Sequence, residues 1–295
     1  MTRSADVHGL IPVLATPFRG DGELDLDSLA RLVDFQLSAG VDGVAVFGFA
    51  SEGFALTARE RAAILRVVTA RVGPHVPVVA GVGATGTREA VEQAAAAAEA
   101  GASVAMLIPP HMVKPSPTQI VDFYGTVAGE GGLPVMVQDA PASTGVTMPV
   151  PLIAELSKLT GVTSVKVETQ PTAPKLGAVV AAVAPDCLVL GGQNALFLLE
   201  EYARGAAGTM PACEFPDLLR TVLDAPDPVA ARAAFNRALP LIRFGLQPGI
   251  AWSIHKHVLV RRGVIDTATV RPPAVDADPA TLATLDAILA DLDLA

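Results

Sequence analysis

Eight short apolar runs of strand length recur along the chain, and this repetition limits what it can fold into. They lie at residues 10–15, 44–48, 76–82, 103–108, 133–138, 162–167, 187–191 and 207–210. Between them lie segments whose apolar residues recur at three- and four-residue spacing, as on an amphipathic helix, and several of these segments close with Gly. Continuous Val, Ile and Leu in the runs favours parallel strands covered on both faces. Eight strand–helix units predict an α/β fold of the (β/α)8 TIM barrel type.

The repeat accounts for residues 1–225, and three further helical patterns follow within residues 226–295. We expect these helices to form a C-terminal extension packed on the barrel. No Pro-, Gly- or Ser-rich linker separates the two parts, so the sequence predicts one structural unit.

Composition narrows the classes of partner. The 295 residues carry a net charge of −9, which argues against nucleic acid because phosphate binding needs clustered Lys and Arg. No apolar run reaches membrane-spanning length, and residues 1–9 lack a signal-peptide pattern. The two cysteines, Cys187 and Cys213, have neither disulfide-framework nor metal spacing. These features predict a soluble, cytoplasmic protein that binds small molecules and needs no metal.

The stretch SVKVETQ, residues 164–170, places a lysine and a glutamate at the end of an apolar strand. Alternate residues of a strand share a face, so Lys166 and Glu168 point one way while Val165 and Val167 point the other. One interpretation is a buried ion pair or a charged strand edge. In a TIM barrel, however, catalytic groups lie where strands end at the C-terminal mouth. The position therefore favours a catalytic amine.

Three other strand ends carry polar, loop-like motifs. They are GFASEGFALT (48–57), PPHMVKP (109–115) and QDAPASTG (138–145). Together with VKVE, this ordered set resembles the dihydrodipicolinate synthase and N-acetylneuraminate lyase family of Schiff-base barrels, over nearly the whole chain. The resemblance implies that Lys166 condenses with the ketone of a 2-oxo acid. It also implies a homotetramer and no cofactor beyond the covalent imine.

Two of these motifs depart from the usual family pattern. Residues 48–52 read Gly-Phe-Ala-Ser-Glu where the family usually has Gly-Thr-Thr-Gly-Glu, and residues 138–141 read Gln-Asp-Ala-Pro where it usually has Tyr-Asn-x-Pro. The tyrosine that normally shuttles protons is therefore missing. Tyr124 and Tyr202 both lie on predicted helices and do not easily replace it. The combination is similar to the branch that contains L-2-keto-3-deoxyarabonate dehydratase.

The chemistry expected of Lys166 is nucleophilic. Enclosure by apolar side chains disfavours an ammonium, and a neutral amine can attack a C2 ketone to form an iminium. The iminium then permits removal of a C3 proton. The resulting enamine expels a C4 hydroxyl in a dehydratase, whereas an aldolase reaches an enamine by cleaving the C3–C4 bond. Glu168 is the candidate acid and base in place of the missing phenol, and pairing with a basic neighbour is its alternative.

Other strand ends supply candidate substrate-binding residues. Ala50 and Ser51 offer amides and a hydroxyl for the C1 carboxylate, and Glu52 is expected to cap that turn. Alternation sends only one of Gln138 and Asp139 inward, and Gln138 is the candidate. The remaining candidates are His111, which could instead lie at a subunit interface, and Gln193 and Asn194, which could instead cap a helix.

Two motifs and one further class of function compete with this interpretation. GVGATG (81–86) matches G-x-G-x-x-G, but no acidic residue ends the next strand, so Gly and Ala crowding at a barrel turn is expected. HKHVLVRRG (255–263) places His255 and His257 on different helix sides and is expected to be a solvated face. A non-catalytic barrel that binds a 2-oxo acid is the alternative outside the enzymes.

Overall fold

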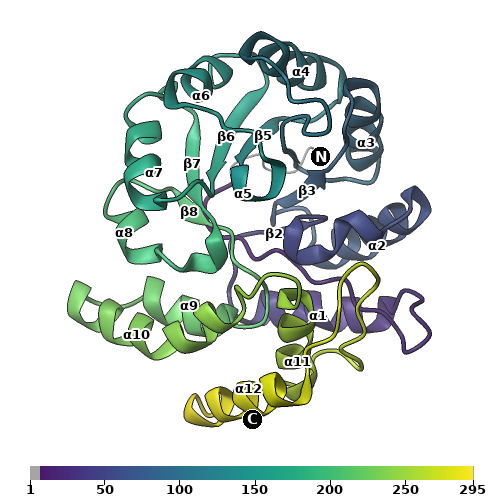
Figure 1. Ribbon diagram of the computed structural model, residues 1–295, viewed down its shortest axis with the longest axis vertical. Helices are drawn as coiled ribbons and strands as arrows, with labels where there is room; N and C mark the ends of the chain where they lie inside the picture. Colours follow the sequence, from purple (N-terminus) through teal and green to yellow (C-terminus); the bar gives the residue numbers. More distant parts are fainter. Residues whose placement is uncertain (1–6, 295) are drawn as a thin grey trace.

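The protein is a closed barrel of eight parallel strands surrounded by helices (Figure 1), as the repeat predicts. The computed structural model describes residues 7–294. The strands run in the order β1-β8-β7-β6-β5-β4-β3-β2, and a parallel bridge between Val13 and Ala45 joins the two ends. Their bounds are β1 (Gly9–Leu10), β2 (Val44–Val46), β3 (Val78–Val82), β4 (Val104–Leu107), β5 (Val135–Asp139), β6 (Val162–Val167), β7 (Leu188–Gly191) and β8 (Gly208–Thr209).

The first strand is shorter than the run 10–15 predicts. Pro12 lacks an N–H and cannot continue the ladder as a donor, although its carbonyl accepts from Ala45 N at 2.8 Å. The chain stays extended to Val13, which closes the ring.

The helices follow the strands in the expected alternation. Their bounds are α1 (Leu26–Ser38), α2 (Ala58–Val72), α3 (Thr87–Glu99), α4 (Pro117–Glu130), α5 (Pro141–Thr144), α6 (Val150–Leu156), α7 (Thr172–Val180), α8 (Leu198–Tyr202), α9 (Pro216–Leu223), α10 (Pro228–Phe244), α11 (Ala251–Arg261) and α12 (Pro279–Asp291). Three 3₁₀ turns lie at η1 (Phe49–Ser51), η2 (Gly53–Ala55) and η3 (Gln193–Ala195). Among residues 7–294, no helix has both the length and the apolar character needed to cross a membrane.

Period-two alternation sorts the strand residues into those that face the helices, in two clusters, and those that face the barrel interior. Val165 and Val167 of β6 face outward, into a cluster that includes Ile153 of α6 and Leu176 of α7. A smaller cluster fills the barrel interior, with Val13, Met106, Met136, Leu190 and Met210 among its members. Lys166 lies between the two outward valines in sequence and therefore points to the interior side.

The glycines of GVGATG serve barrel packing. Gly81 lies on β3, and a Cβ built on it would approach the carbonyl oxygen of Phe47 to 2.3 Å. Only a residue without a side chain permits this contact between neighbouring strand ends. Gly86 is the N-cap residue of α3. This crowding accounts for the motif in the way the sequence predicts.

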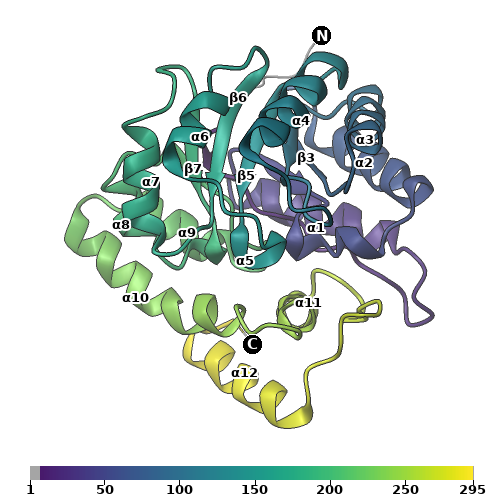
Figure 2. The same cartoon turned by 45° about the horizontal axis from the view of Figure 1, so that its top comes forward.

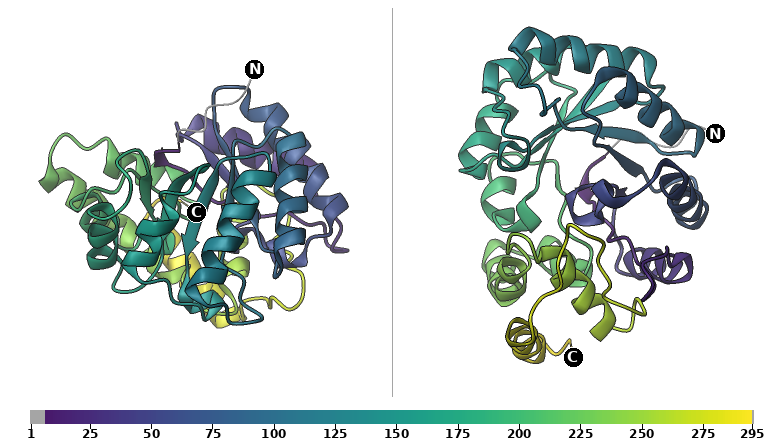
Figure 3. Two further views of the ribbon diagram at one scale, coloured as in Figure 1. Left: turned by 90° about the horizontal axis from the view of Figure 1, so that it is seen from above. Right: turned by 45° about the vertical axis from the view of Figure 1, so that its right-hand side comes forward.

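Helices α10, α11 and α12 form a layer at one end of the barrel (Figure 2), and the views in Figure 3 show the same layer from two other directions. Trp252 of α11 donates from Nε1 to the carbonyl of Phe49 at 2.6 Å, and its ring meets Phe54 edge-on with centroids 5.2 Å apart. The C-terminal helices therefore pack on the turn that follows β2.

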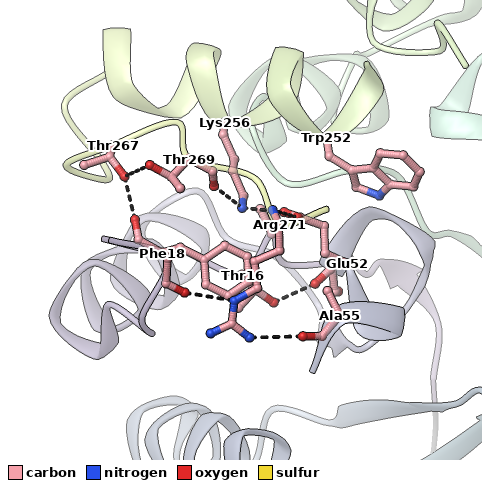
Figure 4. A network of polar contacts seen from close by, with 12 residues as sticks. Thr16, Phe18, Glu52, Ala55, Trp252, Lys256, Thr267, Thr269 and Arg271 are labelled. Carbon is pink, nitrogen blue, oxygen red and sulfur yellow. Dashed lines mark hydrogen bonds and ion pairs between the residues drawn. The ribbon is translucent and has the colours of Figure 1, made fainter. Parts of the chain in front are cut away.

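A buried charge network joins α11 to the same turn (Figure 4). Lys256 forms an ion pair with Glu52, donates to the carbonyl of Thr269 at 2.7 Å and lies 4.2 Å from the ring centre of Phe18. Arg271 donates from its backbone N–H to Glu52 at 2.9 Å, and its guanidinium carbon lies 4.2 Å from the ring centre of Phe18. Burial lowers the pKa of Lys256 to about 8, against the opposing effect of Glu52.

This network corrects two expectations. Glu52 does not cap its turn through its side chain, because the carboxylate is fully buried against Lys256. The segment at residues 255–263 is not a solvated face either, since His255 and Lys256 are both buried. Their side chains face the barrel because α11 docks there.

A second buried charge lies behind the sheet, on α8. Glu201 is fully buried, and neither of its carboxyl oxygens makes a hydrogen bond of normal geometry to a residue within 7–294. It occupies space that a side chain at Gly191 of β7 would fill, since a Cβ there would lie 1.9 Å from Oε2. Burial raises the pKa of Glu201 from 4.5 to about 7.

Replacing Lys256 by Met should destabilise the protein by about 3–5 kcal/mol, because the buried Glu52 carboxylate would lose its ion-pair partner. Urea unfolding measures the difference. Arg237→Met is the matched control, since the Arg237–Asp293 pair is exposed and should be worth less than about 1 kcal/mol. Equal effects of the two substitutions would contradict the role of the network.

Glu201→Gln should remove a pH-dependent loss of stability. In the wild type, the unfolded chain ionises Glu201 from pH 4.5 upward, whereas the folded protein ionises it only near pH 7. Stability is therefore full below pH 4.5 and falls as pH rises toward 7, by about 3 kcal/mol. Urea unfolding at pH 5 and pH 8 should show a smaller decline in Glu201→Gln. Glu200→Gln, at the exposed neighbour, should keep the wild-type decline, and an unchanged decline in Glu201→Gln would refute the assignment.

Candidate active site

A cavity of about 240 Å³ opens at the C-terminal mouth of the barrel. One wall comes from the ends of β6, β7 and β8, with Lys166, Glu168 and Met210 among its residues. A second wall is the segment 245–255. It contains the connection between α10 and α11 and the first residues of α11, including Trp252 and His255. The cavity thus lies between the barrel rim and the C-terminal helices.

Lys166 enters this cavity from the middle of the β5-β6-β7 sheet. It pairs in register with Gln138 of β5 and Leu190 of β7. Its side chain is 4% exposed, and its Nζ lies 3.2 Å from Oε1 of Glu168. The sequence prediction that Lys166 and Glu168 share a face is confirmed by this contact.

Glu168 is held from three directions. Its backbone N–H donates to Asp139 O at 2.9 Å, Gln138 Nε2 donates to its Oε2 at 2.6 Å, and the Gln193 N–H donates to its Oε1 at 3.4 Å. Gly192 makes room for it, because a Cβ there would lie 2.5 Å from the Glu168 Cγ. The carboxylate therefore has a fixed position beside the amine.

The turn after β7 has strained backbone. Gln193, Asn194 and Ala195 have φ values of 50°, 54° and 61°, a left-handed run that costs energy in residues other than glycine. The Asn194 amide stabilises the turn by accepting from Ala212 N at 2.9 Å and donating to Ile242 O at 3.0 Å. Asn194 lines the cavity, but both ends of its amide are occupied. Gln193 donates from Nε2 to the Glu168 carbonyl at 3.1 Å, so it positions the acid.

The two residues of the β2 turn differ in their access to the cavity. Ala50 lines it. Ser51 is buried, its N–H already donates to Gly48 O at 2.9 Å, and its carbonyl accepts from Thr16 Oγ1 at 2.6 Å. The Ser51 hydroxyl has no hydrogen-bond partner among residues 7–294. The sequence suggested that the Ser51 amide and hydroxyl bind the substrate carboxylate. The amide is already hydrogen-bonded within the turn, so only the hydroxyl is left for that role.

His111 and Gln138 lie in a neighbouring cavity of about 350 Å³, over the ends of β2 to β5. Phe49 and Ser143 line both cavities, so the two are adjacent. Gln138 connects them through its bond to Glu168. His111 is therefore at the mouth but not in the cavity that holds Lys166.

Asp139 faces away from the mouth, as alternation with Gln138 predicts. Its carboxyl accepts from Thr169 Oγ1 at 2.6 Å and lies 3.5 Å from Lys175 Nζ, and burial raises its pKa.

Tyr124 donates its hydroxyl to Leu107 O at 2.8 Å on the outer side of the barrel. Neither Tyr124 nor Tyr202 lines either cavity. No phenol of the described chain is therefore available beside Lys166.

Sequence reasoning missed the wall made by α11. Trp252 and His255 lie far along the chain from the strand ends, and His255 belongs to the segment that was expected to be a solvated face. One signal was available: Ala251, His255 and Leu259 recur every four residues, which places His255 on the side of α11 that packs inward. The docking of that side on the barrel mouth could not be read from the spacing.

Comparison with known proteins identifies the family. Residues 6–292 match the Dihydrodipicolinate synthetase family. The L-2-keto-3-deoxyarabonate dehydratase of Azospirillum brasilense is 34% identical over 298 residues, covering 97% of this chain and 94% of that protein. The 4-hydroxy-tetrahydrodipicolinate synthase of Stenotrophomonas maltophilia strain K279a is 39% identical over 188 residues, which span 64% of this chain and 63% of that protein.

Solved structures agree in fold. The dihydrodipicolinate synthase of Rhodopseudomonas palustris superposes with a TM-score of 0.91 at 28% identity, covering 99% of both chains. YagE, a prophage protein of the dihydrodipicolinic acid synthase family from Escherichia coli K12 in complex with pyruvate, gives 0.89 at 28% identity, covering 98% of this chain and 99% of that one. The match across residues 6–292, with the barrel and a lysine buried at its mouth, shows that this chain belongs to the Dihydrodipicolinate synthetase family and is a lyase of that family.

Proposed function

We propose that the protein forms a Schiff base between Lys166 and a 2-oxo acid and dehydrates a 2-keto-3-deoxy sugar acid. One observation carries the proposal: the cavity brings the Lys166 amine within 3.2 Å of a fixed carboxylate, Glu168, and contains no tyrosine. An amine next to a proton acceptor supports imine chemistry. Because neither tyrosine of the chain lines this cavity, we assign proton transfer to Glu168.

The first step is attack of the neutral Lys166 amine on the C2 ketone. Glu168 accepts the proton that the ammonium gives up, over the 3.2 Å that separates Nζ and Oε1. Protonated Glu168 returns that proton to the carbinolamine hydroxyl, which leaves as water, so that a C2 iminium remains and Glu168 is again a carboxylate. The interior side chains around Lys166, including Val13 and Met210, exclude competing water.

The iminium draws electrons from C3, and Glu168 is the base that removes a C3 proton. The electron pair forms the enamine. Protonated Glu168 then gives its proton to the C4 hydroxyl, which leaves as water, and a C3–C4 unsaturated iminium remains. Gln138 and the Gln193 N–H keep Glu168 oriented by hydrogen bonds to its two carboxyl oxygens. Hydrolysis of this iminium restores Lys166 and releases an unsaturated 2-oxo acid, which tautomerises through its C5 hydroxyl to the semialdehyde.

The relatives carry two kinds of name at full length. The Azospirillum dehydratase aligns over 97% of this chain, and 4-hydroxy-tetrahydrodipicolinate synthase 1 of Streptomyces coelicolor aligns over 95% of it, so the choice of dehydration rests on the missing phenol. A pyruvate-dependent aldolase of the same family is the second candidate. Product analysis separates the two, because a dehydratase yields a semialdehyde without carbon loss, whereas an aldolase yields pyruvate and an aldehyde.

We also propose that this chain acts as a homotetramer in the cytoplasm, and that residues 226–295 fold with the barrel as one unit. The packing of α11 on the β2 turn supports the last point. Light scattering measures the assembly.

Lys166→Ala should abolish turnover and adduct formation without unfolding the protein, because the cavity loses its only nucleophilic amine among residues 7–294. Borohydride treatment with pyruvate, followed by mass spectrometry, should give an adduct in the wild type and none in the variant. Lys158→Ala, at an exposed lysine, is the control. An adduct that persists in Lys166→Ala would refute the assignment.

Glu168→Gln should retain borohydride trapping of pyruvate but slow product formation from 2-keto-3-deoxy sugar acids about 10²- to 10⁴-fold, the usual range for general acid–base catalysis. Steady-state kinetics with semialdehyde detection measures the effect. Glu155→Gln, at an exposed carboxylate, serves as the control. Normal turnover by Glu168→Gln would remove Glu168 from the mechanism.

A further inference from the structure

A buried histidine–carboxylate pair adjoins the cavity, whose wall includes His255, and the mechanism above does not use this pair. Glu214 follows β8, and His255 lies on α11. The His255 Nδ1 is 2.6 Å from Oε1 of Glu214, and the two side chains are 7% and 0% exposed. Two polar groups 41 residues apart in sequence are thus paired where water has little access.

The pairing determines which ring nitrogen is available. A carboxylate accepts, so Nδ1 of His255 carries the proton shared with Glu214, and Nε2 is left for another partner. No hydrogen bond joins Nε2 to a residue within 7–294. His255 contributes to the wall of the same cavity as Lys166. The free nitrogen therefore belongs to a side chain that borders the space a substrate would fill.

The ring is also fixed in place. Gly245 lies against it, and a Cβ built there would come within 2.8 Å of the His255 Cε1 and 3.2 Å of Nδ1. The space in front of Gly245 is thus reserved for the imidazole. Together with the Glu214 bond, this contact gives His255 a set orientation, which lowers the entropy cost of binding a ligand.

The pair carries a cost in folding free energy. Glu214 Oε2 has no hydrogen-bond partner among the described residues, and a buried carboxylate with one partner destabilises the fold. His255 gains no second bond from the protein in return. A polar group on a ligand would supply that bond.

The chemistry of the proposed substrate identifies the polar group. Lys166 and Glu168 act on C2 and C3, at the β6 side of the cavity. A 2-keto-3-deoxy sugar acid carries further hydroxyls beyond C3, whereas pyruvate ends at C3 and has none. A hydroxyl can both donate to and accept from an imidazole nitrogen.

We propose that His255, oriented by Glu214, binds a hydroxyl in the tail of the substrate and so selects hydroxylated 2-oxo acids over pyruvate. This inference rests on the proposed function for the identity of the substrate class. His255 is then a specificity-determining residue that contacts substrate, and Glu214 is a positioning residue that acts through it.

The test measures binding without the covalent step. In a Lys166→Ala background, isothermal titration calorimetry gives the Kd of 2-keto-3-deoxyarabonate and of pyruvate. Adding His255→Phe should weaken binding of 2-keto-3-deoxyarabonate about 10- to 100-fold, as expected for a lost hydrogen bond that leaves a polar group unpaired. The Kd of pyruvate should change less than about threefold, since pyruvate has no hydroxyl for His255.

Three further variants separate recognition from structural damage. His255→Gln places an amide near the position of Nε2 and should recover part of the affinity. Glu214→Gln should weaken binding of the sugar acid and leave binding of pyruvate unchanged, because Glu214 acts only through the orientation of His255. His257→Phe is the matched control two residues along α11, where the ring contacts Arg261 and does not line the cavity.

If His255→Phe weakened the binding of both ligands equally, His255 would have a merely structural role and the proposal would be overturned. An unchanged Kd for 2-keto-3-deoxyarabonate would also overturn it. Failure of the proposed function has a different signature, namely no borohydride-trapped imine at Lys166 in the wild type. The binding comparison remains decisive in that case because it does not depend on imine formation.

Discussion

The site depends on one geometric constraint: in a closed ring of parallel strands, every strand ends at the same rim. Because side chains alternate along β6, Val165 and Val167 must face the helices, and Lys166 must face the interior. The parallel bridge from Val13 to Ala45 closes the ring. An open sheet would leave the amine on a covered face, whereas closure places it under a mouth that ligands can enter.

The C-terminal helices turn that mouth into a cavity. Trp252 donates a hydrogen bond to the carbonyl of Phe49, and Lys256 forms an ion pair with Glu52. Helix α11 is therefore attached to the turn after β2 at two points. His255 lies between these anchors and faces the cavity. The extension therefore contributes both stability and a wall with its own polar group.

Backbone strain and buried charge concentrate around the same rim. Phe47 and Glu52 at the end of β2, and three residues after β7, adopt left-handed φ values. Lys166, Glu168, Glu214 and His255 are all largely withdrawn from water. Apolar packing elsewhere in the barrel and its helices offsets these costs, which is how strained and charged groups persist at sites of chemistry. Glu201, whose pKa is raised by burial, extends this pattern behind β7.

The sequence by itself determined the barrel, the three added helices and the position of Lys166 and Glu168 on one face. These features follow from local periodicity: two residues for a strand, 3.6 for a helix, and a strand–helix unit repeated eight times. It also indicated that only one of Gln138 and Asp139 turns inward, and the pairing of Gln138 with Lys166 in the structure shows that Gln138 is the one.

Tertiary structure alone decided which distant residues meet. The burial of Glu52 against Lys256, the pairing of Glu214 with His255, and the placement of His111 in the adjacent cavity all join segments far apart in the chain. Spacing reports which side of a helix is apolar, but not the surface on which that side docks. For α11 that surface is the barrel mouth, and its docking converted an apparently solvated histidine into part of the cavity wall.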